Sequence, residues 1–84
     1  MKVSIRYFAS IRETIGHSGE VVETCAGNLA QLRQELIASG PLHAQALTHG
    51  RTVRMALNQV MCADESAGLV EGDEVAFFPP VTGG

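Results

Sequence analysis

The chain ends in Gly72-Asp73-Glu74-Val75-Ala76-Phe77-Phe78-Pro79-Pro80-Val81-Thr82-Gly83-Gly84, and this stretch decides how the rest of the fold is organised. Gly72-Asp73 is typical of a tight turn, and residues 75–78 have the β-branched and aromatic composition of a strand. Pro79-Pro80 ends that strand, because proline has no N–H to donate to a neighbouring strand. The sequence therefore predicts a last strand that leads into a short tail.

This tail is too short to bury a core and has no charged side chain; it consists of Val81, Thr82, Gly83 and Gly84. Because glycine lacks a Cβ atom, the final pair can pass through a narrow channel and bring the terminal carboxylate to an active site on another protein. Extended from Pro79, the tail reaches roughly 20 Å. The alternative is a frayed terminus that ends in glycine by chance. We expect a domain over residues 1–80 and a flexible tail over 81–84.

Composition predicts one small globular domain. The 84 residues are 45% apolar and 18% charged, with a formal net charge of −3, which is typical of a folded chain. The 6 basic residues are scattered along the sequence, so no basic surface for nucleic acid is expected. No apolar run reaches membrane-spanning length, and the first residues enter a strand pattern without a signal-peptide core. These features predict a cytoplasmic protein with neither a nucleic-acid nor a membrane partner.

The first half of the chain predicts two strands and one main helix. Residues 2–8 alternate, with one face made by Val3, Ile5 and Tyr7 and the other by Ser4, Arg6 and Phe8. Residues 9–15 fit a single helical turn closed by Gly16, and residues 20–23 read as a second strand. Asn28 is a plausible N-cap with Gln31 three residues later, and the helical pattern then runs through Leu29, Leu32, Leu36 and Ile37 to a stop at Gly40-Pro41.

The second half predicts mostly strands. Residues 42–47 are too few to decide on a second short helix. Residues 52–57 alternate again, Asn58-Gln59 favours a turn, and residues 60–62 favour a short strand. Residues 63–71 look like a polar loop anchored by Leu69. This order predicts an α+β fold in which a mixed sheet packs against one main helix in two layers.

Other chemistry is weakly indicated. Cys25 and Cys62 form no C-x-x-C motif and are expected to be reduced thiols, buried or half-buried, with a persulfide role as the alternative. The 3 histidines, His17, His43 and His49, show neither zinc-ligand spacing nor a companion cysteine pair, so we expect no metal and no histidine catalysis. Without a glycine-rich phosphate loop, the chain is not expected to bind ATP by itself.

The carboxyl-terminal stretch quoted above resembles the end of the small subunit of molybdopterin synthase (the MoaD family), a ubiquitin-like sulfur carrier. Residues 7–16, Tyr-Phe-Ala-Ser-Ile-Arg-Glu-Thr-Ile-Gly, are similar to that family's first strand and following turn, and residues 56–59, Ala-Leu-Asn-Gln, to its middle strand. The resemblance implies a β-grasp fold with the first and last strands side by side at the sheet centre. It also implies a partner surface built from Phe8, Met61, Phe78, Pro79 and Pro80.

The same resemblance implies the chemistry. A ubiquitin-activating-type adenylyltransferase would use ATP and Mg²⁺ to adenylate Gly84, and a sulfurtransferase or cysteine desulfurase would supply the sulfur of a thiocarboxylate. The tail would then enter the large synthase subunit in a heterotetramer and donate sulfur to cyclic pyranopterin monophosphate. The chain would be a reactant and no enzyme on its own, since the catalytic side chains would lie in the large subunit. It would bind no cofactor itself.

Three alternatives stay open on sequence grounds. The chain could carry sulfur for thiamine or another product, or could be a ubiquitin-like modifier joined to lysines by an isopeptide bond. It could also be an interaction domain whose function does not depend on Gly84. Acidic residues around the expected partner surface could meet arginines of a partner or could be solvated; they are Asp64, Glu65, Glu71, Asp73 and Glu74.

Overall fold

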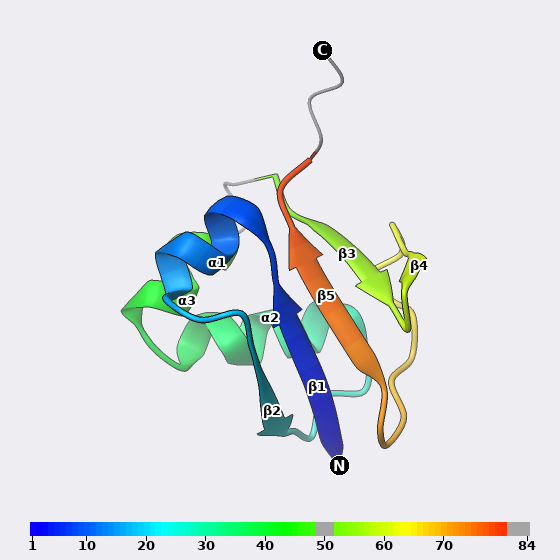
Figure 1. Ribbon diagram of the computed structural model, residues 1–84. Helices are drawn as coiled ribbons and strands as arrows, with labels where there is room; N and C mark the ends of the chain where they lie inside the picture. The colour runs from blue at the N-terminus through cyan, green and yellow to red at the C-terminus, as the bar shows by residue number, and fades with distance from the viewer. Residues whose placement is uncertain (49–51, 81–84) are drawn as a thin grey trace.

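The computed structural model describes residues 1–48 and 52–80, which form one five-stranded sheet with helices against it (Figure 1). The strand order is β2-β1-β5-β3-β4. The strands are β1 (Lys2–Tyr7), β2 (Gly19–Glu23), β3 (Arg54–Leu57), β4 (Val60–Met61) and β5 (Glu74–Phe78). β1 and β5 are parallel neighbours, and the other pairs are antiparallel. The mixed sheet with adjacent first and last strands confirms the predicted β-grasp arrangement.

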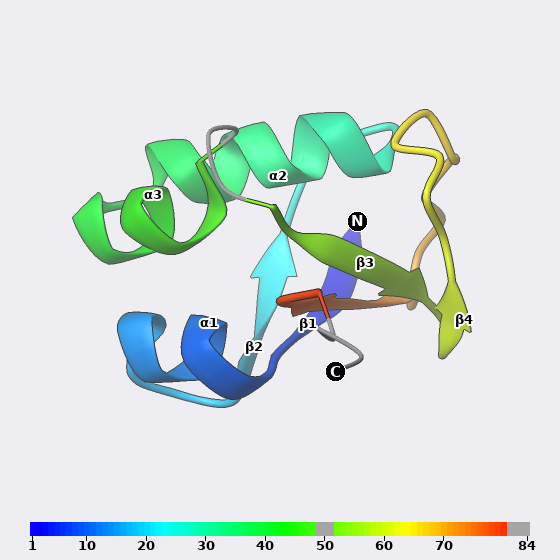
Figure 2. The ribbon, with the colours of Figure 1, turned by 90° about the horizontal axis from the view of Figure 1, so that it is seen from above.

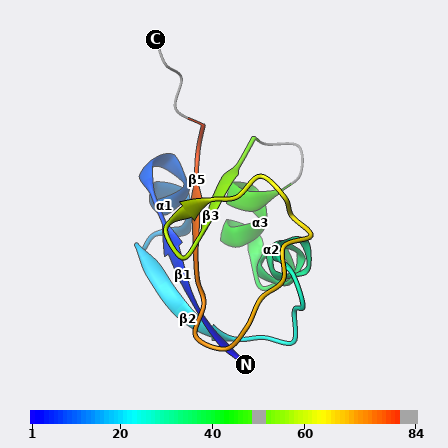
Figure 3. The same ribbon diagram turned by 90° about the vertical axis from the view of Figure 1, so that its right-hand side faces the viewer.

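Helix α2 (Leu29–Ala38) lies behind the sheet in Figure 1, and helix α3 (Pro41–Leu47) continues beside it. Seen from above in Figure 2 and from the side in Figure 3, these two helices lie on the same side of β5. The N-terminus of α2 is closed as predicted: Asn28 Oδ1 accepts from the Gln31 N–H at 2.9 Å. The Gln31 side chain in turn accepts from the Gly27 N–H at 2.7 Å. The first bond satisfies a donor that the first helical turn leaves open, and the second satisfies the N–H of the residue before the N-cap.

The two short helices go beyond the sequence prediction. Helix α1 (Ala9–Ile15) is longer than the single turn expected, and it ends at Gly16 in the left-handed conformation, with φ 100°. Helix α3, which the pattern left undecided, starts with Pro41 in its first turn. Proline suits that position because its missing N–H would have no partner there. Both helices cover core residues at the end of the sheet where β1 and β5 finish, which is where the tail begins.

The core lies between the sheet and the helices. Side chains of alternate strand positions point into it, so the predicted parity of β1 is confirmed; the largest fully buried members are Tyr7, Phe77, Ile5, Leu29, Leu32, Leu47, Val3 and Val75. Leu36 of α2 and Leu69 of the loop before β5 join the same cluster. The loop residue thus anchors its segment as expected. Within the described ranges, no helix is long and apolar enough to cross a bilayer.

Asp73 corrects one expectation about the acidic residues. The sequence predicts that it lies around the partner surface, where it meets a partner's arginine or is solvated, but its side chain is buried. Asp73 Oδ1 accepts from the Asn58 amide at 3.0 Å and Oδ2 from the Val70 N–H at 2.9 Å. Asn58 Oδ1 also accepts from the Glu74 N–H at 2.9 Å. Asp73 therefore ties the β3–β4 turn to the start of β5, and its carboxylate is used inside the domain.

Arg33 is a second buried charge with a structural task. Its Nε donates to the Leu47 carbonyl at 2.8 Å and its Nη2 to the Thr48 carbonyl at 3.2 Å. Its Nη1 lies 3.7 Å from Glu65 Oε1. The guanidinium thereby satisfies carbonyls at the C-terminal end of α3, which a helix leaves without partners. Arg33 holds α3 against α2, and it draws Glu65 of the predicted acidic rim into this contact.

Candidate functional site: the open sheet face and the root of the tail

The strand register places a row of small and apolar side chains across the face of the sheet opposite α2. Arg6 of β1 pairs with Ala76 of β5, Ala76 with Ala56 of β3, and Ala56 with Met61 of β4. Paired residues of neighbouring strands point to the same face. Ala76 and Ala56 are nearly covered, whereas Met61 is 64% exposed. The middle of this open face is therefore a shallow methyl floor with a protruding methionine at one side.

The two predicted aromatic residues lie at the tail end of the same face. Tyr7 pairs with Phe77 in the parallel register, and the Phe8 N–H donates to the Phe77 carbonyl at 3.1 Å. The next residues along the two strands, Phe8 and Phe78, are therefore neighbours. Phe8 is 42% exposed, and Phe78 is half-buried. The prediction that Phe8, Phe78 and Met61 avoid the core of the domain is confirmed. We call Phe8, Ala56, Met61, Ala76 and Phe78 the apolar face.

Charges at the edge of the apolar face are mixed. Arg54 pairs with Phe78 across β3 and β5, and the Arg6 guanidinium carbon lies 5.7 Å from the centre of the Phe8 ring. Glu74 is half-buried at the start of β5. Two arginines thus border the aromatic end of the apolar face. This arrangement favours a partner whose surface combines apolar side chains with acidic groups.

The remaining predicted acids have contacts of their own. Glu71 Oε1 accepts from the Lys2 N–H at 3.0 Å. Asp64 accepts hydrogen bonds from the hydroxyl and the backbone N–H of Ser66, which hold the pKa of its carboxyl below the usual range. Asp64 is fully exposed and stays charged. The acids therefore form no single rim around the apolar face.

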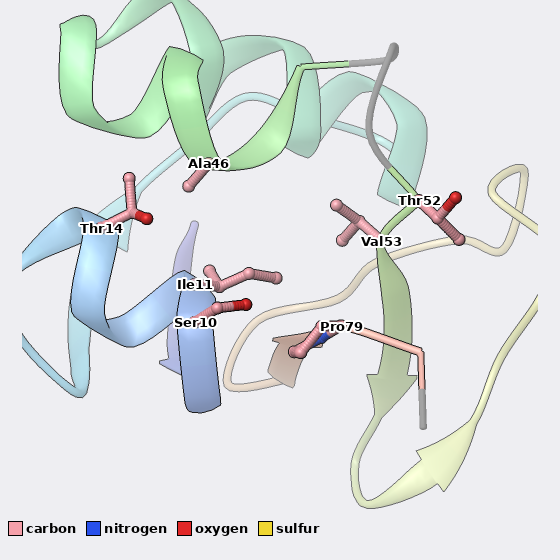
Figure 4. Close-up of a pocket in the computed structure, with 7 residues that line it drawn as sticks. All are labelled: Ser10, Ile11, Thr14, Ala46, Thr52, Val53 and Pro79. Atoms are coloured by element: carbon pink, nitrogen blue, oxygen red, sulfur yellow. The ribbon is translucent and has the colours of Figure 1, made fainter. Parts of the chain in front are cut away.

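The root of the tail is the pair Pro79-Pro80, both half-buried at the end of β5. Pro79 lines a pocket of about 250 Å³ between α1, α3 and the segment before β3 (Figure 4). The other lining residues are Ser10, Ile11, Thr14, Ala46, Thr52 and Val53. These described lining residues offer hydroxyl groups and methyl surface, with no acid or base among them. Pro79 therefore forms one wall of this pocket, at the end of the last strand.

The predicted tail residues Val81, Thr82, Gly83 and Gly84 lie outside the described residues. The boundary between domain and tail at residue 80 and the role of the terminal carboxylate stay predictions. Of the thiols, Cys62 is half-buried as expected, but Cys25 is exposed, which corrects the expectation for it. Cys25 lies in the connection between β2 and α2, between the buried Thr24 and Ala26.

Sequence reasoning missed the two alanines of the apolar face. A small apolar residue in a strand gives no signal by itself, because alanine is as common in cores as on surfaces. The register supplies the missing information, since it places Ala56 and Ala76 side by side between larger neighbours. Alternation within β3 and β5 could have assigned each alanine to the outer face. It could not have shown that the two alanines are paired, because pairing depends on the register between the strands.

Comparisons with known proteins agree with this geometry. A model of the ThiS family matches residues 5–84. The molybdopterin synthase sulfur carrier subunit of Escherichia coli (strain K12) is 38% identical over 82 residues, covering 98% of this chain and 99% of the relative. Small archaeal modifier protein 3 of Haloferax volcanii is 30% identical over 98 residues, covering 100% of both chains.

Solved structures show the same fold. A chain in the complex of subunits 1 and 2 of the molybdopterin-converting factor from Helicobacter pylori 26695 superposes with a TM-score of 0.71 at 26% identity, covering 100% of both chains. SAMP1 from Haloferax volcanii superposes with a TM-score of 0.79 at 20% identity, again over 100% of both chains, and at that identity it supports the fold alone. With a family match over nearly its whole length and close curated relatives, this chain belongs to the ThiS family.

Proposed function

We propose that this chain is the sulfur carrier subunit of a molybdopterin synthase. The observation that carries the proposal is the end of β5: the central strand of the sheet runs past the apolar face into Pro79-Pro80 and a Gly83-Gly84 terminus. The E. coli relative with that name matches over nearly the full length of both chains. Because β5 contributes to the docking face and also leads to the thin tail, the sheet can bind a partner while the terminus reaches into that partner.

The terminal carboxylate needs activation before it can carry sulfur. A carboxylate with a usual pKa of about 3.3–3.7 is ionised at neutral pH and resists attack by nucleophiles. In the proposed sequence, an oxygen of the Gly84 carboxylate attacks the α-phosphorus of ATP on an activating enzyme, and pyrophosphate leaves. Sulfur derived from cysteine then replaces AMP at the carboxyl carbon. ATP and Mg²⁺ belong to the activating enzyme in this proposal, and this chain holds no cofactor for the reaction.

The resulting thiocarboxylate is the donor. Its sulfur is a polarisable nucleophile, and the large synthase subunit would hold the pterin substrate and supply the acid and base groups. The thiocarboxylate would be consumed and the Gly84 carboxylate restored, so the chain acts as a carrier and the catalytic side chains lie in the partner. The subunit 1 and 2 complex from Helicobacter pylori supports a large-subunit partner for this fold. The heterotetramer, the adenylyltransferase, the sulfur-supplying enzyme and the cytoplasmic location are part of the proposal.

Intact mass analysis of the protein isolated from its own cells tests the proposal. A sulfur-for-oxygen mass shift that fragmentation places at Gly84 is the expected result. The second candidate is a ubiquitin-like modifier, which the 30% identical small archaeal modifier protein 3 favours. A modifier would leave higher-mass conjugates with isopeptide bonds from Gly84 to lysines. Such conjugates without any thiocarboxylate would overturn the carrier assignment.

A further inference from the structure

Two histidines and a glutamate gather beneath the edge strand β2, far from each other in sequence. They are His17 from the α1–β2 connection, Glu20 of β2 and His43 of α3. Their ligand atoms all lie within 4.8 Å of one another. His43 Nε2 is 2.8 Å from Glu20 Oε2, and His17 Nε2 is 4.0 Å from the same oxygen. The sequence spacing of the histidines gave no sign of this cluster, because α3 and β2 meet only in the folded domain.

The backbone fixes which nitrogen of His17 faces the cluster. His17 Nδ1 lies 3.1 Å from the Gly19 carbonyl oxygen. Since a carbonyl only accepts, Nδ1 carries the proton, and in a neutral imidazole Nε2 then has a free lone pair. That nitrogen lies 4.0 Å from Glu20 Oε2, which is also an acceptor. A cation bound between the two acceptors would stabilise both. An imidazole whose other nitrogen is held by a carbonyl is also the usual state of a metal-bound histidine.

Hydrogen bonds from two neighbouring side chains hold Glu20 as a carboxylate that can bind a cation. The buried Tyr7 hydroxyl donates to Glu20 Oε2 at 2.7 Å. Partial burial alone would raise the pKa of Glu20, but hydrogen bonds from His43 and Tyr7 outweigh it and hold that pKa below its usual range. Burial, and then the contact with Glu20, raise the pKa of Tyr7. The phenol therefore stays protonated and orients the carboxylate from behind.

The distances suit a small divalent cation. With bonds of about 2.0–2.1 Å, ligand atoms in a tetrahedral zinc site are roughly 3.3 Å apart. The separations of 2.8 and 4.0 Å from the two histidines to Glu20 Oε2 need adjustments of under about 1 Å, and the two histidine nitrogens, which lie within 4.8 Å of each other, need one of under about 1.5 Å. The His17 side chain is 47% exposed, which leaves an entry path and room for water. We propose that His17 Nε2, Glu20 and His43 Nε2 bind a zinc ion, with water as the remaining ligand.

Zinc would replace the hydrogen bond between His43 and Glu20. A carboxylate only accepts, so His43 Nε2 carries the proton in the metal-free domain. On binding, Nε2 loses that proton to solvent and Nδ1 takes one up, which keeps the imidazole neutral. The ion would then tie together the α1–β2 connection, the edge strand and α3. Glu20 pairs with Ile5, so it lies on the helix side of the sheet, away from the apolar face.

The test is zinc binding by the tag-free, full-length chain in isothermal titration calorimetry. We expect one zinc ion per chain, with ring ¹⁵N shifts at Nε2 of His17 and His43. His17→Gln, Glu20→Gln and His43→Gln should each weaken binding more than tenfold. Tyr7→Phe removes only the hydroxyl behind Glu20 and should weaken it about 10–100-fold. A hundredfold excess of free zinc over its dissociation constant should raise the melting temperature on the order of 10 °C, whereas Mg²⁺ should not.

Matched controls separate this site from other ligands. Glu23→Gln makes the same change on the same strand, and Cys25→Ser, Cys62→Ser and His49→Gln remove the other residues that zinc prefers; all four should bind zinc like the wild type. The proposal is overturned if millimolar zinc gives no binding, if Glu20→Gln and His43→Gln retain it, or if Cys62→Ser abolishes it. Thiocarboxylate formation at Gly84 is a separate readout, so either proposal can fail alone.

Discussion

Ala56 lies directly opposite Ala76 on the open face of the sheet, and the two residues are 9% and 8% exposed. Their methyl groups form a floor between Phe78 at the tail end and the exposed Met61 at the β4 side. A floor of small side chains bordered by large apolar ones accepts protruding side chains of a partner, because interface cores are close-packed. The same strand leads to Pro79-Pro80, so a partner bound on this face would lie next to the root of the tail, as the proposed function requires.

Phe8→Asp should abolish docking on the large synthase subunit while leaving the domain folded. Burying an unpaired carboxylate in the interface is costly, and loss of an aromatic anchor typically costs roughly 2–4 kcal/mol. Phe8 is also the N-cap of α1, with φ −128° and ψ 154° and no side-chain cap. Aspartate is a preferred N-cap, so this change should not weaken the helix. Surface plasmon resonance with the purified large subunit measures the effect.

Val21→Asp is the matched control for Phe8→Asp. Val21 is 67% exposed and pairs with Ser4 on the same open face, but on the outermost strand, away from the apolar face. It should retain native affinity for the large subunit. Phe78→Asp should behave like Phe8→Asp. If both phenylalanine variants bound as tightly as the wild type, the open face would not be the docking surface.

Leu36→Ala should destabilise the domain by roughly 2–5 kcal/mol through the cavity it leaves between α2 and the sheet. Leu36 is buried in the same cluster as Val3, Ile5 and Val75. The control is Leu42→Ala on α3, where the leucine is 50% exposed and the same truncation should cost under about 0.5 kcal/mol. Urea unfolding followed by circular dichroism compares the two. Equal midpoints for the two variants would contradict the assignment of the buried face of α2.

Asn28→Ala should cost about 1 kcal/mol of unfolding free energy, because the Gln31 N–H loses its acceptor at the start of α2. Asn28→Ser should restore most of it, since serine is an equally good N-cap. Sulfur transfer should be unaffected at temperatures well below the midpoint. A serine variant as unstable as the alanine variant would show that the cap hydrogen bond contributes nothing.

Much of the fold follows from the sequence because its signals are local. The alternation in β1, the Asn28 cap and the Gly40-Pro41 stop each rest on residues close together, and the structure confirms the elements they predict. Whether residues 42–47 form a helix was undecided because six residues give too little periodicity, and the position of α3 depends on Arg33 of the preceding helix. That contact spans 14 residues and leaves no local pattern.

The candidate sites show the same contrast between local sequence signals and contacts between residues far apart in the sequence. Phe8 and Phe78 could be assigned to the outer face from strand parity alone. The acidic residues could not be assigned, because the fate of Asp73 depends on Asn58, which approaches it only through the β3–β4 turn. The His17, Glu20 and His43 cluster was missed for the same reason. Metal-ligand spacing rules detect ligands that lie close together in the sequence. This cluster draws on three segments, and His43 is 23 residues from Glu20.

Function should depend on where the chain stops, because the reacting atom in the proposed mechanism is the carboxyl carbon of Gly84. One residue added after Gly84 moves the carboxylate by about 3.5 Å, and a misplacement of about 1 Å can cost on the order of a hundredfold in rate. Deletion of Gly84 should be as damaging. Gly83→Ala tests channel width separately, since it adds only a methyl group. All three variants should dock like the wild type, since the apolar face is unchanged. Adenylation assays and pterin product formation measure the loss, and an extended protein, shown by mass to be unprocessed, that formed product at the wild-type rate would exclude the terminal carboxylate as the reacting group.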